Sequence, residues 1–281
     1  GIIKEDLNVL PPRGSVMKRI EAAGLTSDQA GYLWMDDSLG FILDKLDELK
    51  LTENTVVLFI ADHGSGHKGS LYKAKGTEVP CIMRWPAGMK AGIRSQELIQ
   101  NTDFVPTWFE LAGAKPTAKY RMDGVSLVSL FQEPHKPVRK HIYAEIGAAR
   151  SIKTKSHSYI ALRYTREQVA GVRESHRRYL KTLTGLSGGV SRSIATHPRA
   201  YIGDQLYDLK RDPDAQKNLA GYPSHARTLK QLKQTLAVEL NKFSGRPYGE
   251  FVPGGNAVPG GGYDEVFEIL RKAAGDKKKK K

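Results

Sequence analysis

The sequence predicts an α/β fold in which a mainly parallel sheet is followed by a smaller antiparallel subdomain. Three observations support this prediction. An amphipathic helix comes directly before a continuous apolar and β-branched segment, an order typical of α/β proteins. That segment, Thr55–Ile60, is apolar throughout, as strands of parallel sheets are when they are buried on both faces. From about His135 the apolar segments become short and alternate with polar residues, as antiparallel strands do.

The first helix is predicted over residues 27–50, with Thr26 and Ser27 as candidate N-caps. Its apolar side chains recur at three- and four-residue spacing, which places them on one face: Leu39, Ile42, Leu43, Leu46 and Leu49. After the strand Thr55–Ile60, the sequence predicts a second short strand over Val79–Trp85.

A further helix is expected over Asp103–Ala112, because Pro106 suits its first turn and Gly113 its end. The antiparallel subdomain is predicted from short strands near residues 141–146, 150–154, 159–164 and 205–209. A helix marked by leucines follows: Leu229, Leu232, Leu236 and Leu240. These elements predict an α/β portion over 1–134, an antiparallel subdomain over 135–243 and a tail over 244–281.

Within these regions, residues 166–183 are predicted to form a basic helical insertion, followed by a Gly/Ser loop over 185–193. The tail is rich in Gly and Pro up to Gly262, which predicts an extended, loosely packed segment. A short helix is expected around Val266–Leu270, and the run Lys277–Lys281 is expected to be disordered.

The charge balance favours polyanionic partners. The 281 residues carry a net charge of +14, of which Lys277–Lys281 supply five, so the remaining body is still at +9. A nucleic-acid binder is disfavoured, because aromatic residues do not alternate with the basic ones in a stacking pattern. No segment approaches the roughly 18 apolar residues that a membrane-spanning helix needs.

The single cysteine, Cys81, excludes an intrachain disulfide and a multi-cysteine metal site. It lies in the apolar run Val79–Ile82, so we expect it to be a small buried hydrophobe. No leader with a charged and then apolar region is visible from Gly1 onward, and this end is expected to be the cut end of a longer protein.

Polar side chains follow the predicted strand Thr55–Ile60 at its carboxyl end, where open α/β sheets bind ligands. Asp62 and His63 are adjacent there, and both can face one ion only if the strand gives way to a loop, which Gly64 permits. His67 and Lys68 follow in a glycine-flanked loop. A lysine beside a metal-binding carboxylate suits an anionic oxyester. The residues alone also allow a surface Asp-His turn and a solvated loop lysine.

Several short motifs then follow one another at fixed spacing: Asp37–Leu43, Asn54–Gly64, His67–Tyr72, Gly76–Pro86, Asp103–Thr107, Leu111–Gly113, Asp123–Leu127, Gln205–Pro213 and Asn218–Ala220. Together they resemble the C-terminal part of the catalytic domain of sulfatases, which belong to the alkaline phosphatase superfamily. The resemblance covers residues 24–240 and leaves the insertion 166–193 unmatched. It implies a sulfatase-type parallel-sheet sandwich with a smaller antiparallel C-terminal subdomain.

The resemblance also implies an activity and a site. Sulfatases are sulfuric ester hydrolases that act on sulfated carbohydrates or aryl sulfates. They bind one Ca²⁺, and Asp62 and His63 match one pair of its ligands, although Ca²⁺ prefers oxygen. Lys68 matches a lysine that contacts the sulfate, and His67 would line the site near the leaving oxygen. Periplasmic, secreted or lysosomal localisation is what the family implies.

Two features of the family are missing from this sequence. The nucleophile, a formylglycine made within Cys/Ser-x-Pro-x-Arg, has no counterpart, because Cys81-Ile-Met-Arg84 lacks the proline. The two N-terminal aspartate ligands are also absent, and Asp36 and Asp37 lie on a helix instead. We therefore expect a C-terminal portion whose partner is the N-terminal portion of the same enzyme. A phosphonate or phosphate ester hydrolase and a non-catalytic polyanion-binding relative are the alternatives.

Overall fold

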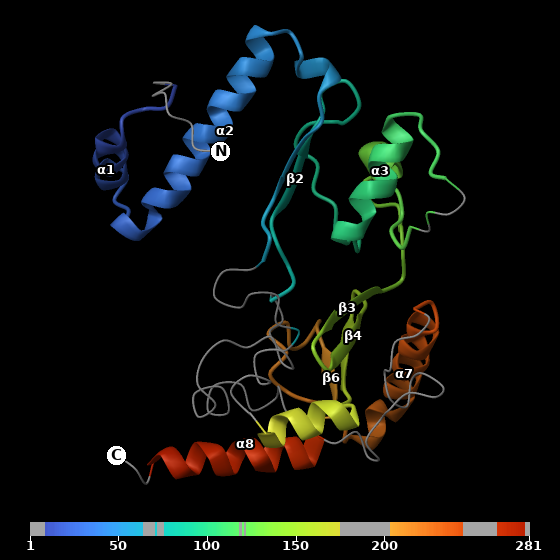
Figure 1. Ribbon diagram of the computed structural model, residues 1–281. Coiled ribbons are helices and arrows are strands. Elements are labelled where there is room, and N and C mark those ends of the chain that lie inside the picture. The colour runs from blue at the N-terminus through green and yellow to red at the C-terminus, as the bar shows by residue number, and fades with distance from the viewer. Residues whose placement is uncertain are drawn as a thin grey trace. The chain divides into compact units, whose positions relative to one another are not determined.

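The computed structural model describes residues 9–63, 71, 76–117, 120, 122–174, 203–243 and 263–278 (Figure 1). The chain divides into two compact units. The first unit combines residues 1–58 with 82–93, and the second combines residues 59–81 with 94–281. Among the described residues, no helix is long and apolar enough to cross a membrane.

The first unit begins with two helices joined by a tight connection. Helix α1 spans Arg13–Ala22, and a 3₁₀ turn at Ser27–Gln29 leads into α2, Ala30–Glu48. The Thr26 N–H donates to the Gln29 Oε1 at 3.1 Å, which satisfies a backbone donor at the start of the turn. The predicted helix and its start are confirmed. None of the residues of α2 is fully buried, so its apolar face is only partly covered.

Two short strands follow. A 3₁₀ turn at Thr52–Asn54 precedes β1, Val57–Ile60, which pairs with β2, Cys81–Arg84. The N–H of Ala61, just after β1, donates to the carbonyl of Pro80, just before β2, at 3.4 Å. The end of one strand therefore lies beside the start of the other, which makes the pair antiparallel.

Both predicted strands are confirmed, but two expectations about them are not met. The parallel partners expected for β1 are not among the strands of the described residues. Its side chains are also only partly buried, and Ile60 is exposed. Cys81 is exposed rather than buried, because the side chains of β2 at its first two positions face solvent.

The second unit contains the helix expected near Asp103. A 3₁₀ turn at Asn101–Asp103 leads into α3, Phe104–Leu111, and α4 follows at Val128–Gln132. Helix α3 ends where predicted, because Gly113 adopts φ +62° and its N–H donates to the Glu110 carbonyl.

A four-stranded antiparallel sheet forms the centre of the second unit, which confirms the predicted antiparallel strands. Its order is β3-β4-β5-β6, so each strand pairs with its neighbour along the chain. The strands are β3 Ile142–Ile146, β4 Ala149–Lys153, β5 His157–Leu162 and β6 Asp204–Asp208.

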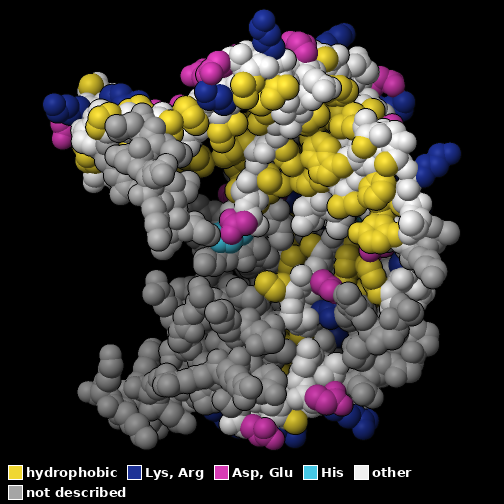
Figure 2. Space-filling view, turned by 45° about the horizontal axis from the view of Figure 1, so that its top comes forward, with side chains coloured by type: hydrophobic (Ala, Val, Ile, Leu, Met, Phe, Trp, Pro, Cys, Tyr) yellow, Lys and Arg dark blue, Asp and Glu magenta, His cyan; other side chains and the backbone are white. Residues whose placement is uncertain are grey.

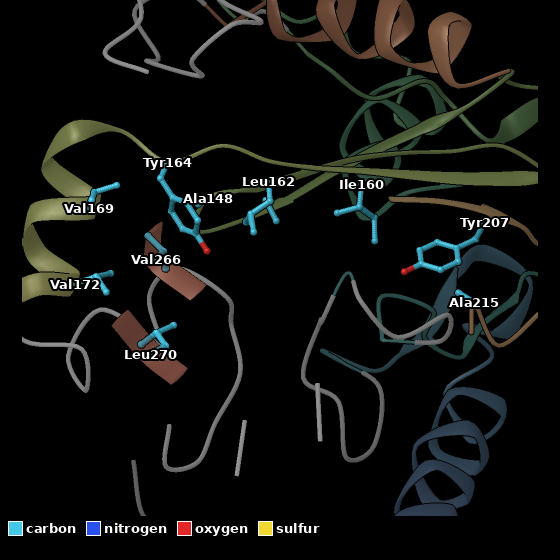
Figure 3. Packing of buried hydrophobic residues seen from close by; sticks show 11 residues of the cluster. Ala148, Ile160, Leu162, Tyr164, Val169, Val172, Tyr207, Ala215, Val266 and Leu270 are labelled. Carbon is cyan, nitrogen blue, oxygen red and sulfur yellow. The ribbon is translucent and has the colours of Figure 1, made fainter. Parts of the chain in front are cut away.

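Each face of this sheet is covered by helices. On one face, Tyr159 and Leu206 pack against the buried leucines of α7, Ala226–Leu240, which follows the 3₁₀ turn Pro223–His225. These leucines are the predicted ones, Leu232, Leu236 and Leu240. On the other face, Ile160 and Leu162 belong to a cluster that includes the helical residues 166–174 and α8 (Figure 3). Alternating side chains of β5 thus enter two cores.

The C-terminal helix confirms the short helix expected around Val266–Leu270 and is longer than expected. Helix α8 spans Tyr263–Lys278, and Figure 3 shows Val266 and Leu270 near Tyr164 and Val169. Both α8 residues are buried, so this helix is part of the core. The helix also includes Lys277 and Lys278, which were expected to be disordered. Residues 175–202 and 244–262 lie outside the described residues.

Candidate functional site

The candidate site begins where β1 ends. The Ala61 N–H still bonds to Pro80, and the chain then bends at Asp62 and His63. Because the extended conformation has ended, these adjacent side chains are able to turn toward one another. The His63 N–H donates to the Asp62 Oδ1 at 2.9 Å, and the His63 Nε2 lies 3.4 Å from the Asp62 Oδ2. The two side chains therefore contact each other at the end of β1.

The exposure of the Asp62 and His63 side chains bears on whether they can bind a cation. The Asp62 side chain is 86% exposed and that of His63 is 36% exposed. An exposed carboxylate keeps its lone pairs available to a cation or to water, and the neighbouring imidazole adds a nitrogen donor. Among the described residues, no group of three or more His, Cys, Asp and Glu side chains could hold a metal ion. Asp62 suits Ca²⁺ as an oxygen ligand, but the pair is only part of the six to eight oxygens that this ion takes.

His67 and Lys68, the predicted catalytic residues, lie outside the described residues. Their proposed roles therefore remain predictions from the sequence. The helical aspartates are not substitutes for missing ligands. Asp37 on α2 pairs with Arg19 on α1, with an Arg19 Nη1 to Asp37 Oδ1 distance of 2.9 Å. The hydrogen bond from Arg19 lowers the pKa of Asp37, so this carboxylate already has a structural partner.

Cys81 lacks the properties of a nucleophile. Partial burial of its thiol raises the pKa of Cys81, although the residue as a whole is exposed. A raised pKa keeps sulfur in the thiol form at neutral pH, and the thiolate is the reactive form. This agrees with the interpretation that Cys81-Ile-Met-Arg84 is not a modification motif.

The motif around Asp103 is a buried polar junction. The Asp103 carboxylate is fully buried and accepts hydrogen bonds from the N–H of Gln100 at 2.7 Å and of Val125 at 2.9 Å. It also pairs with the guanidinium of Arg139. Gly124 is required beside it, because a Cβ there would overlap the Thr102 carbonyl. The motif thus joins α3 to the segment before α4.

The last matching motif is also structural. The Asn218 side chain accepts from the N–H of Leu206 at 2.9 Å and of Ala220 at 3.0 Å, and it donates to the Asp204 carbonyl at 3.1 Å. The Leu219 N–H donates to the Leu206 carbonyl at 2.7 Å. These bonds satisfy the backbone groups along the outer edge of β6, which would otherwise be an unpaired sheet edge.

Sequence reasoning missed a charged cluster at the start of β6. The Asp204 carboxylate accepts from the Tyr159 hydroxyl at 2.9 Å, from Arg163 at 2.9 Å and from Lys233 at 2.7 Å. These residues show no regular spacing in the sequence, because the pairing of β5 with β6 and the packing of α7 bring them together. Burial raises the pKa of Asp204, but Arg163 and then Lys233 outweigh it, so the pKa lies below its ordinary value of 3.8.

This cluster predicts a dependence of stability on pH. A carboxylate whose pKa is lowered by folding stabilises the protein above its unfolded pKa. Its contribution should begin to fall below pH 3.8 and vanish below the folded-state pKa. Urea unfolding between pH 2 and 7 should therefore show a shallower acid loss in Asp204→Asn than in the wild type. Parallel stability curves for the two proteins would contradict the assignment.

Comparison with known proteins shows that the chain is similar to sulfatases. Residues 18–114 match the family model described as Sulfatase. An ulvan-active sulfatase of Formosa agariphila is 32% identical over 209 residues, which cover 70% of this chain and 38% of that protein. An N-acetylglucosamine-6-O-sulfatase of Bacteroides thetaiotaomicron is 24% identical over 220 residues, covering 74% of this chain and 34% of that protein.

A solved structure, of a protein in complex with its substrate D-glucosamine-2-N,6-O-disulfate, has the same fold. The TM-score is 0.58 at 22% identity, over 79% of this chain and 41% of that chain. The chain thus spans between 34 and 41% of the length of these three relatives.

Proposed function

We propose that this chain is the C-terminal portion of a sulfuric ester hydrolase. Its residues 18–114 match the family model of sulfatases. The observation that supports this most directly is the pair Asp62 and His63, which converges just beyond β1 at the position where the family motif has metal ligands. The whole enzyme is proposed to act on a sulfated carbohydrate or an aryl sulfate. Relatives named for ulvan and for N-acetylglucosamine 6-O-sulfate favour a carbohydrate.

The roles of the chain's own residues follow from their chemistry. Asp62 would hold Ca²⁺ through its carboxylate, with His63 beside it as a weaker ligand. When bound, the cation would supply positive charge that favours an anionic sulfate. Lys68 would add an ammonium that stabilises charge on the sulfate oxygens, and His67 would lie near the leaving oxygen. The formylglycine nucleophile would come from the N-terminal portion of the same enzyme.

An exposed apolar surface on the first unit supports such a partner. Tyr32 is 64% exposed and Ile42 is 51% exposed, both on α2, and Ile82 of β2 is 62% exposed. By contrast, the leucines of α7 that face the antiparallel sheet are buried. Figure 2 shows hydrophobic side chains gathered on the visible surface. A two-stranded sheet alone is only marginally stable, so further packing elements would stabilise it.

The function is tested by joining the chain to the upstream portion of its own protein. The joined enzyme should release sulfate from glucosamine 6-sulfate or an aryl sulfate in the presence of Ca²⁺, while the chain alone should not. Mass spectrometry should find formylglycine in the upstream portion. Hydrolysis of a phosphate monoester without any sulfate release would contradict the proposal.

Lys68→Ala should lower kcat in the joined enzyme by about 10²–10³, because removal of one preorganised charge contact typically costs this much. Its thermal unfolding should be unchanged, since a lysine in a glycine-flanked loop contributes little packing. Lys68→Arg should restore only part of the rate, because a planar guanidinium places its charge differently. Wild-type turnover in Lys68→Ala would refute the role and make Lys73 or Lys75 the next candidates.

A further inference from the structure

A surface groove lies between the start of α7 and the segment 220–223, within the second unit. Its volume is about 440 Å³, and its lining includes Tyr222, Leu229, Lys230 and Lys233. None of the described residues that line it is acidic. The groove therefore combines apolar and aromatic surface with ammonium groups, and it contains neither Asp62 nor His63.

The backbone of Tyr222, the aromatic residue at the groove, is fixed by hydrogen bonds. The Tyr222 N–H donates to the Leu219 carbonyl at 3.1 Å, and the Tyr222 carbonyl accepts from His225 at 2.9 Å. The Lys217 Nζ lies 5.3 Å from the ring centroid, within cation–π distance. The side chain is nevertheless 47% exposed. An accessible aromatic ring is a suitable surface for the C–H groups of a pyranose ring.

The positive charge around this ring is in excess. Arg227 and Lys230 are three residues apart on α7, which places them on neighbouring positions of one helix face. Both are exposed, and neither forms an ion pair with any described residue; the same holds for the ammonium of Lys217. Lys233 is different, because the Asp204 carboxylate fixes its ammonium at 2.7 Å. Arg227 and Lys230 thus remain available to anionic groups, whereas the Lys217 ammonium already lies over the Tyr222 ring.

We propose that this groove binds a sulfated saccharide. The sugar ring would lie against Tyr222 and Leu229, and its sulfate groups would pair with Arg227 and Lys230. An apolar ring that carries several charged substituents matches a groove with an apolar floor and a cationic rim. The inference goes beyond the proposed hydrolase activity, because binding here needs no catalytic residue.

The test is a binding measurement on the 281-residue chain, with a heparin-derived tetrasaccharide and its desulfated counterpart as probes. Calorimetry should detect the sulfated probe only. Tyr222→Ala should weaken binding up to about tenfold, and Lys230→Ala severalfold, as expected for loss of an aromatic contact and a charge contact. Lys210→Ala is the matched control, because it removes one exposed positive charge of the same unit from outside the groove.

Three outcomes would overturn the proposal. Unchanged affinity in both groove variants would place binding elsewhere. Equal losses in Lys210→Ala and Lys230→Ala would mean diffuse charge attraction. Equal binding of the desulfated probe would remove the role of sulfate. All three variants replace exposed side chains and should keep the wild-type circular dichroism spectrum. Because sulfate release is not the readout, failure of the hydrolase proposal would leave this result intact.

Discussion

Asp62→Ala is expected to abolish Ca²⁺-dependent sulfate release by the joined enzyme. The carboxylate is 86% exposed at the bend after β1, so the substitution removes an oxygen ligand without opening a cavity. A catalytic cation contributes several kcal/mol through charge stabilisation, which corresponds to a loss of at least about 10³ in kcat. Thermal unfolding of the metal-free protein should change by less than about 0.5 kcal/mol, as for other surface substitutions.

Calcium affinity provides a readout that is independent of turnover. Isothermal titration should show weaker Ca²⁺ binding by Asp62→Ala than by the wild-type joined enzyme. Asp36→Ala is the matched control, because Asp36 is an exposed carboxylate on α2. It should leave both affinity and turnover unchanged. Unaltered Ca²⁺ affinity in Asp62→Ala would remove this residue from the metal site.

Asp103→Ala is expected to destabilise the second unit by about 3–5 kcal/mol, the usual cost of leaving a buried charge without its partner. The substitution would leave the Arg139 guanidinium, whose side chain is only 11% exposed, without its carboxylate. It would also leave the N–H groups of Gln100 and Val125 without their acceptor. Urea unfolding followed by fluorescence is suitable, because Trp108 lies on the adjacent helix α3.

A double-mutant cycle separates this junction from a general loss of packing. Asp103→Ala, Arg139→Ala and the double variant should give a coupling energy of about 1–3 kcal/mol. Glu110→Ala is the control, because it removes an exposed carboxylate from α3 itself, and it should cost less than about 0.5 kcal/mol. Additive losses in the cycle would show that Asp103 and Arg139 stabilise the unit independently.

Local patterns in the sequence determined most of the elements. The leucine spacing of residues 229–240 reflects one nearby core, so period and burial agree. The end of α3 was predictable for a similar reason, because Gly113 satisfies a local backbone requirement. The candidate ligands Asp62 and His63 were found through a motif and a strand end, which are also local features.

The burial of β1 and the exposure of Cys81 could not be predicted in this way. The apolar residues of a strand show that it is suited to burial. Whether the strand is buried within this chain depends on the elements that pack against it. The same holds for Val266 and Leu270, because the sequence predicts their helix but not the core that they fill beside residues 166–174.

The polar clusters were decided by tertiary structure alone. Asp103 and Arg139 are 36 residues apart, and Asp204 lies 45 residues from Tyr159 and 41 from Arg163. Residues so far apart show no periodic pattern in the sequence, because oppositely charged groups pair wherever folding brings them into contact. The sequence alone therefore indicated the resemblance to sulfatases, the helices and strands and the candidate ligands, whereas tertiary packing decided which charges are buried as pairs and which apolar faces remain exposed.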